Sequence, residues 1–216
     1  TLVYDPLAHM IWGGGFLSQL GILDFAGGNV VHISSGISGL IAAILLGKRS
    51  NAKNSTPNSL PLAILGAALI WVGWFGFNVG SALTFNSIAM NAFISTMVAS
   101  AAGAVGWSFV EWTTKRKPTV LGAVSGAISG LVSITPACGF VEIFASLPIG
   151  FIGGIVCFYG VTAIKQKLGY DDTLDAFGLH GIGGIWGGMA TGLFATTKVN
   201  EAGANGLFYG DPKHLL

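Results

Sequence analysis

Two histidines stand in matching surroundings far apart in the chain. His32 lies eight residues after Asp24, and His180 lies eight residues after Asp172. The glycines that follow at four and seven residues are Gly36, Gly39, Gly184 and Gly187. An imidazole can donate and accept hydrogen bonds and exchange a proton near neutral pH. The pattern therefore predicts two copies of one helix, each presenting an imidazole for hydrogen bonding and proton transfer.

The composition places these histidines in a membrane. Apolar residues make up 52% of the 216 residues and charged residues 9%, where a soluble domain carries about 25%. This excludes a soluble enzyme and a disordered chain, and a net charge of +1 gives no reason to expect nucleic acid as a partner. Cys138 and Cys157 make neither a disulfide framework nor a metal set. An ionisable residue inside a membrane span is costly, so each histidine is a functional candidate.

Gaps between charged residues give the number of spans, because a membrane helix needs about 20 mostly apolar residues. The charge-free stretch 54–110 is long enough for two spans, and we expect Asn78, Asn86 and Asn91 near the turn between them. The six predicted spans are 25–46, 60–83, 89–111, 119–138, 145–166 and 176–196.

The basic residues predict the orientation. Most of them lie in alternate connections, and the loops near 84–90 and 139–144 have none. These cations are Lys48, Arg49, Lys53, Lys115, Arg116, Lys117, Lys165 and Lys167. Because cations collect on the cytoplasmic side, the first span runs inward and the sixth runs outward. Two like helices in opposite directions indicate an inverted repeat, whose shared site lies near the bilayer midplane.

Glycines at every fourth residue predict close helix crossings. Such stripes are Gly122, Gly126 and Gly130; Gly184, Gly188 and Gly192; and Gly150 and Gly154. Small residues allow membrane helices to approach closely, so these stripes indicate a compact bundle. An isolated membrane histidine is often hydrogen-bonded packing, but a pair in inverted copies favours a shared pore.

Four segments together resemble one family. They are DFAGGNVVHISSG at 24–36, WFGFNVGS at 74–81, TPACG at 135–139 and DDTLDAFGLHG at 171–181. In this order they resemble the ammonium transporter (Amt/Mep) family, with Asn29 as one departure where threonine is common. The resemblance implies part of an all-α, polytopic membrane helix bundle with the inverted-repeat ammonium transporter fold. The family has eleven membrane helices, and this chain resembles the fifth to the tenth.

The resemblance and the orientation divide the chain into three parts. Residues 1–23 form an extracytoplasmic segment, residues 24–200 form the six-helix part, and residues 201–216 form an extracytoplasmic loop. The first residues carry neither an initiator Met nor a basic leader, so we expect an internal piece of a longer protein. We expect a multi-pass protein of the cell membrane, with a prokaryotic plasma membrane favoured.

The resemblance assigns roles along a path for ammonium. Trp12 resembles a recruitment tryptophan, whose ring attracts a cation by about 0.5–2 kcal/mol, and Ser81 resembles a hydroxyl that accepts a hydrogen bond from the same ion. Phe77 resembles a ring that closes the outer mouth of the pore. Trp74 resembles a residue that faces the pore near its middle. Taken alone, Trp12 also suits a membrane-interface belt, and Phe77 and Trp74 also suit core packing.

Three further residues are predicted to support the site. Asp24 resembles a residue that stabilises the ion site indirectly, and it also suits a cap on the start of the first span. Asp172 is expected to cap the sixth span in the same way. Thr135 resembles a residue near the pore that hydrogen-bonds the neighbouring backbone.

Desolvation cost predicts the mechanism. A small cation that enters an apolar pore loses its hydration at a cost of many kcal/mol, whereas neutral ammonia avoids most of that cost. We therefore expect ammonium to be bound outside and deprotonated, with ammonia and the proton conducted past His32 and His180. Buried imidazoles stay neutral and would pass hydrogen bonds and protons along the pore wall.

Three other functions fit parts of the pattern. An ammonium sensor would use the same site coupled to a signalling domain. Two membrane histidines on neighbouring helices also hold haem in b-type cytochromes, and small neighbours here leave room for a ring. A channel for water or another small neutral solute is a third alternative, but it would need neither Trp12 nor the histidine pair.

The resemblance also implies the partners. Ammonium, ammonia and methylammonium are the expected substrates, and no enzyme activity, metal or organic cofactor is expected. The family forms homotrimers, and in prokaryotes a PII signalling protein blocks the inner mouth of the pore. The loops at 47–54 and 115–118 would face such a partner.

Overall fold

The structure is a computed structural model that describes residues 2–50 and 58–212. Within them, helices are joined by short loops, and a single antiparallel bridge pairs Val141 with Ala195. The helices are α1 (Tyr4–Trp12), α2 (Phe16–Gln19), η1 (Gly28–Ile33), α3 (Ser34–Leu46), α4 (Leu60–Gly80), α5 (Ser87–Lys115), α6 (Val120–Ile134), η3 (Ile143–Ala145), α7 (Ser146–Tyr159), η4 (Gly160–Ile164), α8 (Lys165–Leu168), η5 (Phe177–Gly181), α9 (Ile182–Phe194) and η6 (Leu207–Tyr209).

Each of the six predicted spans coincides with a helical segment. Four segments in the described part are long and apolar enough to cross a membrane: Gly28–Leu46, Leu60–Gly80, Ser87–Lys115 and Ile143–Leu168. Val120–Ile134 is a shorter apolar helix, and the sixth span is formed by η5 and α9. The all-α polytopic membrane bundle predicted from the sequence is therefore confirmed.

The turn predicted in the long charge-free stretch is only partly correct. Asn78 is not in the turn: it is fully buried within α4, and its Nδ2 donates to Thr96 Oγ1 at 3.0 Å. Asn86 caps α5, because its Oδ1 accepts a hydrogen bond from Ala89 N at 2.9 Å. Asn91 lies inside α5, and its Nδ2 donates to the carbonyl oxygens of Cys138 and Val141. An asparagine can occupy a buried position within a helix when a hydrogen-bond partner satisfies its side-chain amide.

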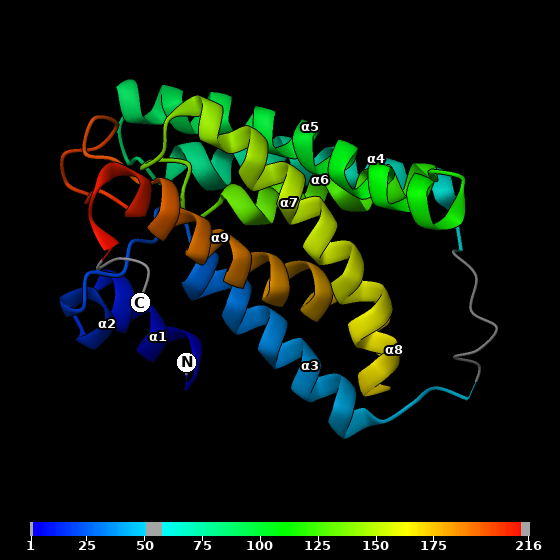
Figure 1. Cartoon of the computed structure of the whole chain (residues 1–216). Helices are drawn as coiled ribbons and strands as arrows, with labels where there is room; N and C mark the ends of the chain where they lie inside the picture. The colour runs from blue at the N-terminus through cyan, green and yellow to red at the C-terminus, as the bar shows by residue number, and fades with distance from the viewer. Residues whose placement is uncertain (1, 51–57, 213–216) are drawn as a thin grey trace.

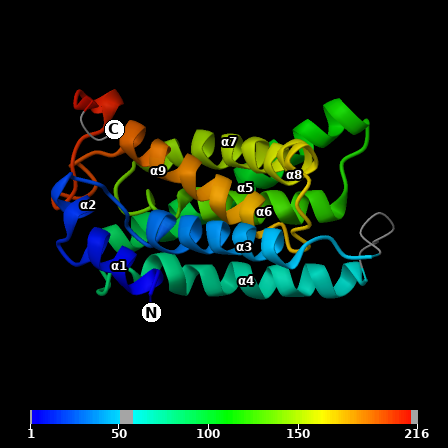
Figure 2. The same ribbon diagram turned by 90° about the horizontal axis from the view of Figure 1, so that it is seen from below.

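The long helices lie side by side, and most of the cations lie at one end of the bundle. Figure 1 shows the connections after α3, after α5 and after α8 at the same end of the bundle, while α1, α2 and the C-terminal segment lie at the other; Figure 2 shows the same separation from below. We call the first the basic end. The ends of α3, α5 and α8 and the connections that follow them carry seven described cations: Lys48, Arg49, Lys115, Arg116, Lys117, Lys165 and Lys167. The predicted orientation places these cations on one side of the membrane, and their position at one end of the bundle agrees with it.

Glycine stripes bring α5, α6 and α7 into contact. A methyl group added at Gly126 or Gly130 of α6 would lie 2.6 Å from Gly103 O or 2.1 Å from Ala99 O of α5. A methyl added at Gly150 of α7 would lie 2.2 Å from that same Ala99 oxygen. Side chains larger than glycine would therefore separate these helices, as expected for packing without a hydrophobic driving force.

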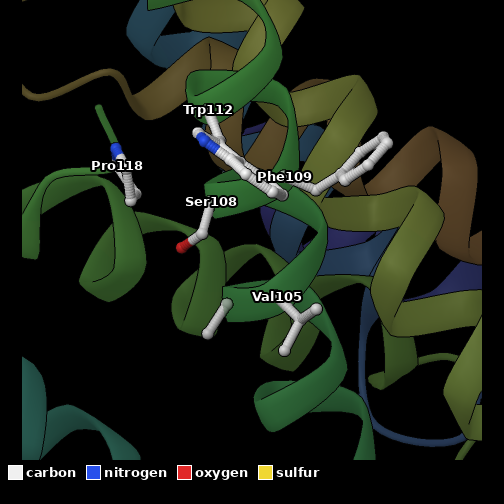
Figure 3. Close-up of a pocket in the computed structure, with 6 residues that line it drawn as sticks. Val105, Ser108, Phe109, Trp112 and Pro118 are labelled. Atoms are coloured by element: carbon white, nitrogen blue, oxygen red, sulfur yellow. The ribbon is translucent and has the colours of Figure 1, made fainter. Parts of the chain in front are cut away.

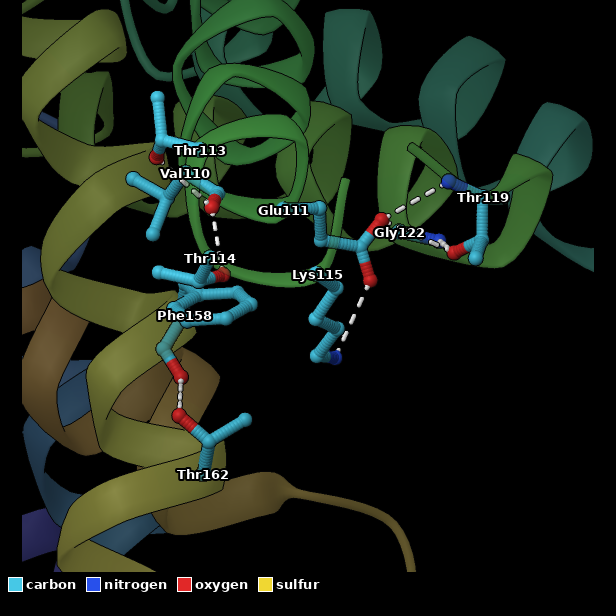
Figure 4. A network of polar contacts seen from close by, with 9 residues as sticks. All are labelled: Val110, Glu111, Thr113, Thr114, Lys115, Thr119, Gly122, Phe158 and Thr162. Carbon is cyan, nitrogen blue, oxygen red and sulfur yellow. Dashed lines mark hydrogen bonds and ion pairs between the residues drawn. The ribbon is translucent and has the colours of Figure 1, made fainter. Parts of the chain in front are cut away.

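A buried carboxylate holds the connection between α5 and α6 (Figure 4). Glu111 Oε2 accepts hydrogen bonds from Thr119 N at 2.9 Å and Thr119 Oγ1 at 3.0 Å, and Lys115 Nζ lies 3.4 Å from its other oxygen. Thr119 Oγ1 in turn accepts from Gly122 N at 2.9 Å and caps α6. Partners on both sides make the buried charge tolerable at this position.

Candidate functional site

The two histidines lie in two copies of one local structure. His32 belongs to the π-helical turn η1, which continues into the 13 residues of α3, and His180 belongs to the π-helical turn η5, which continues into the 13 residues of α9. The histidines are 148 residues apart, and the same separation relates the ends of α3 to those of α9. Single π-helical turns often mark functional sites because they redirect side chains.

Glycine contacts let the two copies cross at the histidines. A methyl group added at Gly36 would lie 2.2 Å from Gly181 N, and one added at Gly184 would lie 3.2 Å from the Cβ of His32. These two glycines are the ones predicted from their equal spacing after the histidines. Because the backbones nearly touch here, the side chains one turn earlier meet.

The two imidazole rings form a direct contact. His180 Nδ1 lies 3.2 Å from His32 Nδ1, and the ring centroids are 5.2 Å apart. His32 is buried, with 3% of its surface exposed, and His180 is half-buried. Rings in this contact leave no space for an iron porphyrin between them, so the geometry does not fit the haem alternative.

Thr135 connects the histidine pair to two neighbouring helices. Its Oγ1 donates to Leu131 O at 2.8 Å, accepts a hydrogen bond from Trp74 Nε1 at 3.0 Å, and lies 3.2 Å from His32 Nε2. The hydroxyl has one proton, which Leu131 O receives, so His32 Nε2 must be the donor to Thr135. Sequence reasoning predicted the backbone hydrogen bond of Thr135 but not these side-chain contacts.

The tautomers of both histidines follow from this assignment. With its proton on Nε2, His32 presents a lone pair at Nδ1, so His180 Nδ1 must donate the hydrogen bond between the rings. His180 Nε2 is then an acceptor, and no hydrogen bond to it occurs within residues 2–50 and 58–212. The histidine pair can therefore accept a hydrogen bond from a ligand at one defined atom, His180 Nε2.

Two aromatic side chains of α4 stack against the histidine pair. The Trp74 ring lies 5.2 Å from His32 and 6.5 Å from His180, with interplanar angles of 21° and 17°. The Phe77 ring lies 5.7 Å from His32 on a residue that is 36% exposed. The structure thus brings both predicted pore residues to the histidines.

Asp24 caps the first histidine turn. Its Oδ1 accepts from Gly27 N and Gly28 N, and its Oδ2 accepts from Asn29 N and Val30 N, at 2.7–3.0 Å. A carboxylate at this position satisfies amides at the start of the helix that have no helical partner, and it complements the helix dipole. The capping interpretation of Asp24 is the one that these contacts support.

Trp12 and Ser81 both lie at the end opposite the basic end. Trp12 Nε1 donates to Asp24 O at 2.7 Å, and 44% of its surface is exposed. Ser81 Oγ donates to Phe77 O at 2.8 Å, which leaves its lone pairs free to accept. Their role in recruiting an ion stays a prediction.

Asp172 caps the second histidine turn, as predicted: its Oδ2 accepts a hydrogen bond from Phe177 N at 2.9 Å. Lys165 and Asp175 also hold this turn, and sequence reasoning missed both. Lys165 was interpreted as an orientation signal, although its position ten residues before Asp175 could have indicated an ion pair across the turn. Part of the predicted partner loop, residues 51–54, lies outside the described residues.

A surface hollow lies away from the histidines. It has a volume of about 410 Å³ and lies along α5, beside the connection that leads to α6. Figure 3 shows Val105, Ser108, Phe109, Trp112 and Pro118 around it. None of its lining residues carries a charge, which suits a surface facing lipid.

Known proteins resemble the whole chain. A sequence model of the Ammonium Transporter Family matches residues 1–216. An ammonium transporter of Bacillus subtilis is 68% identical over 211 residues, covering 98% of this chain and 52% of that protein. Ammonium transporter Amt1 of Archaeoglobus fulgidus is 49% identical over 219 residues, covering 100% and 55%.

Solved structures agree with these relatives. The crystal structure of Saccharomyces cerevisiae Mep2 is 38% identical with a TM-score of 0.92, over 99% of this chain and 51% of that one. A structure titled Sensor Amt Protein is 30% identical with a TM-score of 0.84, over 93% and 54%. The chain spans about half the length of the relatives it matches. Its sequence, its helices and its crossed histidine copies show that the chain belongs to the ammonium transporter family.

Proposed function

We propose that the complete protein carries ammonium across the cell membrane and that this chain supplies the histidine pair of its pore. The observation that carries the proposal is the 3.2 Å contact between His180 Nδ1 and His32 Nδ1 inside an apolar bundle. Buried ionisable groups in a membrane are energetically costly, so they usually mark transport or proton-transfer sites. Relatives with the name ammonium transporter support the same substrate.

Ammonium binds first at the end opposite the basic end. The exposed ring of Trp12 offers a cation–π contact worth about 0.5–2 kcal/mol, and its Nε1 bond to Asp24 O orients the ring. Ser81 Oγ offers a lone pair to an N–H of the same ion. Phe77, next to His32, separates this site from the histidines.

The ion then gives up its proton, because charge is costly between apolar helices. Ammonia passes the histidine pair and donates an N–H to His180 Nε2, the acceptor left open by the tautomers. The proton moves separately: His180 Nε2 accepts it from the ion, His180 Nδ1 passes its own proton to His32 Nδ1, and His32 Nε2 releases a proton to water when its bond to Thr135 opens. Trp74 and Thr135 keep His32 in the required orientation through the contacts of Thr135 Oγ1.

The experiment is uptake of labelled methylammonium by cells that express the complete protein. We expect uptake by the wild type, and loss of uptake in the His32→Ala and His180→Ala variants at equal amounts in the membrane. Wild-type uptake by both variants would contradict the role of the pair. Absence of uptake by the wild type, together with a signalling response to ammonium, would favour the sensor.

The assembly is also part of the proposal. We propose a homotrimer with one pore per subunit, and a PII-type signalling protein at the basic end, where seven of the eight described cations lie. Cross-linking and mass measurement of the purified protein would test the trimer. Addition of a PII protein should reduce uptake if the partner binds there.

A further inference from the structure

The two copies of the histidine turn are anchored differently. In the first copy, Asp24 accepts hydrogen bonds from four consecutive backbone N–H groups, those of residues 27–30. In the second copy, the equivalent Asp172 carboxylate accepts from Phe177 N, among the described residues. The second turn therefore lacks most of the capping that closes the first, although both turns carry a histidine of the pair.

A lysine takes over this function in the second copy. Lys165, at the start of α8, donates from Nζ to the carbonyl oxygen of Asp172 and to Asp175 Oδ1, the latter at 2.7 Å. Its side chain is 25% exposed, and that of Asp175 is 37% exposed. The ammonium group of Lys165 thus links Asp172 and Asp175, which both lie in the segment that precedes η5.

The backbone shows why this lysine matters. Asp175 has φ 54°, and the residue at the same place in the first copy is Gly27, with φ 117°. Glycine adopts a positive φ without steric cost, whereas aspartate is strained there. The carbonyl oxygen of Gly27 accepts from Val31 N, and that of Asp175 accepts from Leu179 N at 2.9 Å. The strained Asp175 therefore starts the turn that orients His180, the residue after Leu179.

We propose that Lys165 is a positioning residue for His180: its ammonium group holds Asp172 and Asp175 and so keeps the second histidine turn aimed at His32. This inference rests on the proposed function of the histidine pair. Without Lys165, Asp175 would lose the partner that keeps its backbone in the left-handed region, and the π-helical turn would relax. The first turn needs no such cation because glycine and the Asp24 cap suffice.

Comparison of the two copies suggests how to test the role of Lys165. In the complete protein, Lys165→Met should lower methylammonium uptake about tenfold or more, since small displacements of reacting groups have effects of this size. Lys165→Arg, which retains the charge, should keep most of the uptake. Lys167→Met is the matched control, because Lys167 is exposed on the same short helix, and it should behave as wild type.

A second substitution separates positioning from general stability. Asp175→Gly gives the second turn the residue that the first turn has, so it should restore much of the uptake lost in Lys165→Met. A crystal structure of Lys165→Met should show the two Nδ1 atoms more than 3.5 Å apart, and the double variant should bring them together again. A purely structural role of Lys165 would give no rescue by glycine at this position.

Two results would overturn the inference. One is wild-type uptake in Lys165→Met, and the other is reduced uptake with the histidine contact intact and no rescue by Asp175→Gly. The His180→Ala variant is measured alongside. If His180→Ala is inactive while Lys165→Met is normal, the inference about Lys165 fails and the proposed function stands. If His180→Ala and His32→Ala both show wild-type uptake, the proposed role of the histidine pair itself fails.

Discussion

Replacing Thr135 with valine removes one hydroxyl and leaves the shape of the side chain almost unchanged. In the structure, that hydroxyl accepts from Trp74 Nε1 at 3.0 Å and from His32 Nε2 at 3.2 Å, and it donates to Leu131 O at 2.8 Å. All of these groups lie in the buried part of the bundle. The substitution therefore leaves donors without an acceptor, which costs more than the loss of an exposed hydrogen bond.

The magnitude follows from the number of donors left unpaired. Each buried donor without a partner costs about 1–3 kcal/mol, so the loss of both acceptor contacts would destabilise the protein by about 2–6 kcal/mol. His32 can avoid part of this cost by moving its proton to Nδ1, which leaves Trp74 Nε1 unpaired at about 1–3 kcal/mol. That change would make His180 Nε2 a donor, and transport would slow because the open acceptor is lost.

The assay is thermal unfolding of the purified complete protein together with methylammonium uptake. Thr135→Ser keeps the hydroxyl and serves as the control. Trp74→Phe removes the indole donor, so adding it to Thr135→Val should cost less than the sum of the two single substitutions. Equal stability of Thr135→Val and Thr135→Ser, or additive effects in the double variant, would refute the hydrogen-bond assignment.

Three further predictions concern the backbone and the charges around the site. Gly36→Ala should lower the unfolding temperature and abolish uptake, because its methyl group would lie 2.2 Å from Gly181 N and push the histidine copies apart. Asp24→Asn should cost about 2–6 kcal/mol of stability, since the amide nitrogen cannot accept the two N–H groups now bound to Oδ2. The Arg49 guanidinium lowers the pKa of Asp171 to about 2, so the stability from this pair should be constant between pH 5 and 8 and disappear as the pH falls from about 4 through 2.

The controls for these predictions come from the same chain. Gly39→Ala should cost much less than Gly36→Ala, because its methyl group would meet the Ala176 methyl at 3.2 Å and a shift of a few tenths of an ångström relieves that contact. Asp172→Asn should cost less than the matching change in the first copy, because its carboxylate accepts fewer backbone N–H groups. Asp171→Asn should differ from wild type by a constant amount above pH 5; a difference that changes between pH 6 and 8 would contradict the pKa assignment.

The repeat could be predicted from the sequence because it depends on spacing alone. Equal distances from aspartate to histidine and from histidine to glycine identified both copies, and the structure reproduces them down to the bounds of α3 and α9. The spans followed from charge-free stretches, since the bilayer imposes length and composition on any helix that crosses it.

The remaining contacts depend on tertiary structure, which spacing does not reveal. The two π-helical turns that carry the histidines occur where the helices cross, and no local sequence preference predicts them. Thr135 hydrogen-bonds partners 61 and 103 residues away. Asn78 suited a turn by composition, but its burial beside Thr96 decided its place. Lys165 looked like an orientation signal, because a pattern of cations does not show which of them has a carboxylate partner.

Ammonium-triggered current is the most direct measurement of the central claim, that His32 and His180 together pass the proton and the substrate. The complete protein would be reconstituted in vesicles and the charge movement recorded after a jump in ammonium concentration. We expect a current in the wild type and none in His32→Ala or His180→Ala, at equal amounts of folded protein. Wild-type currents in both single variants would contradict the account.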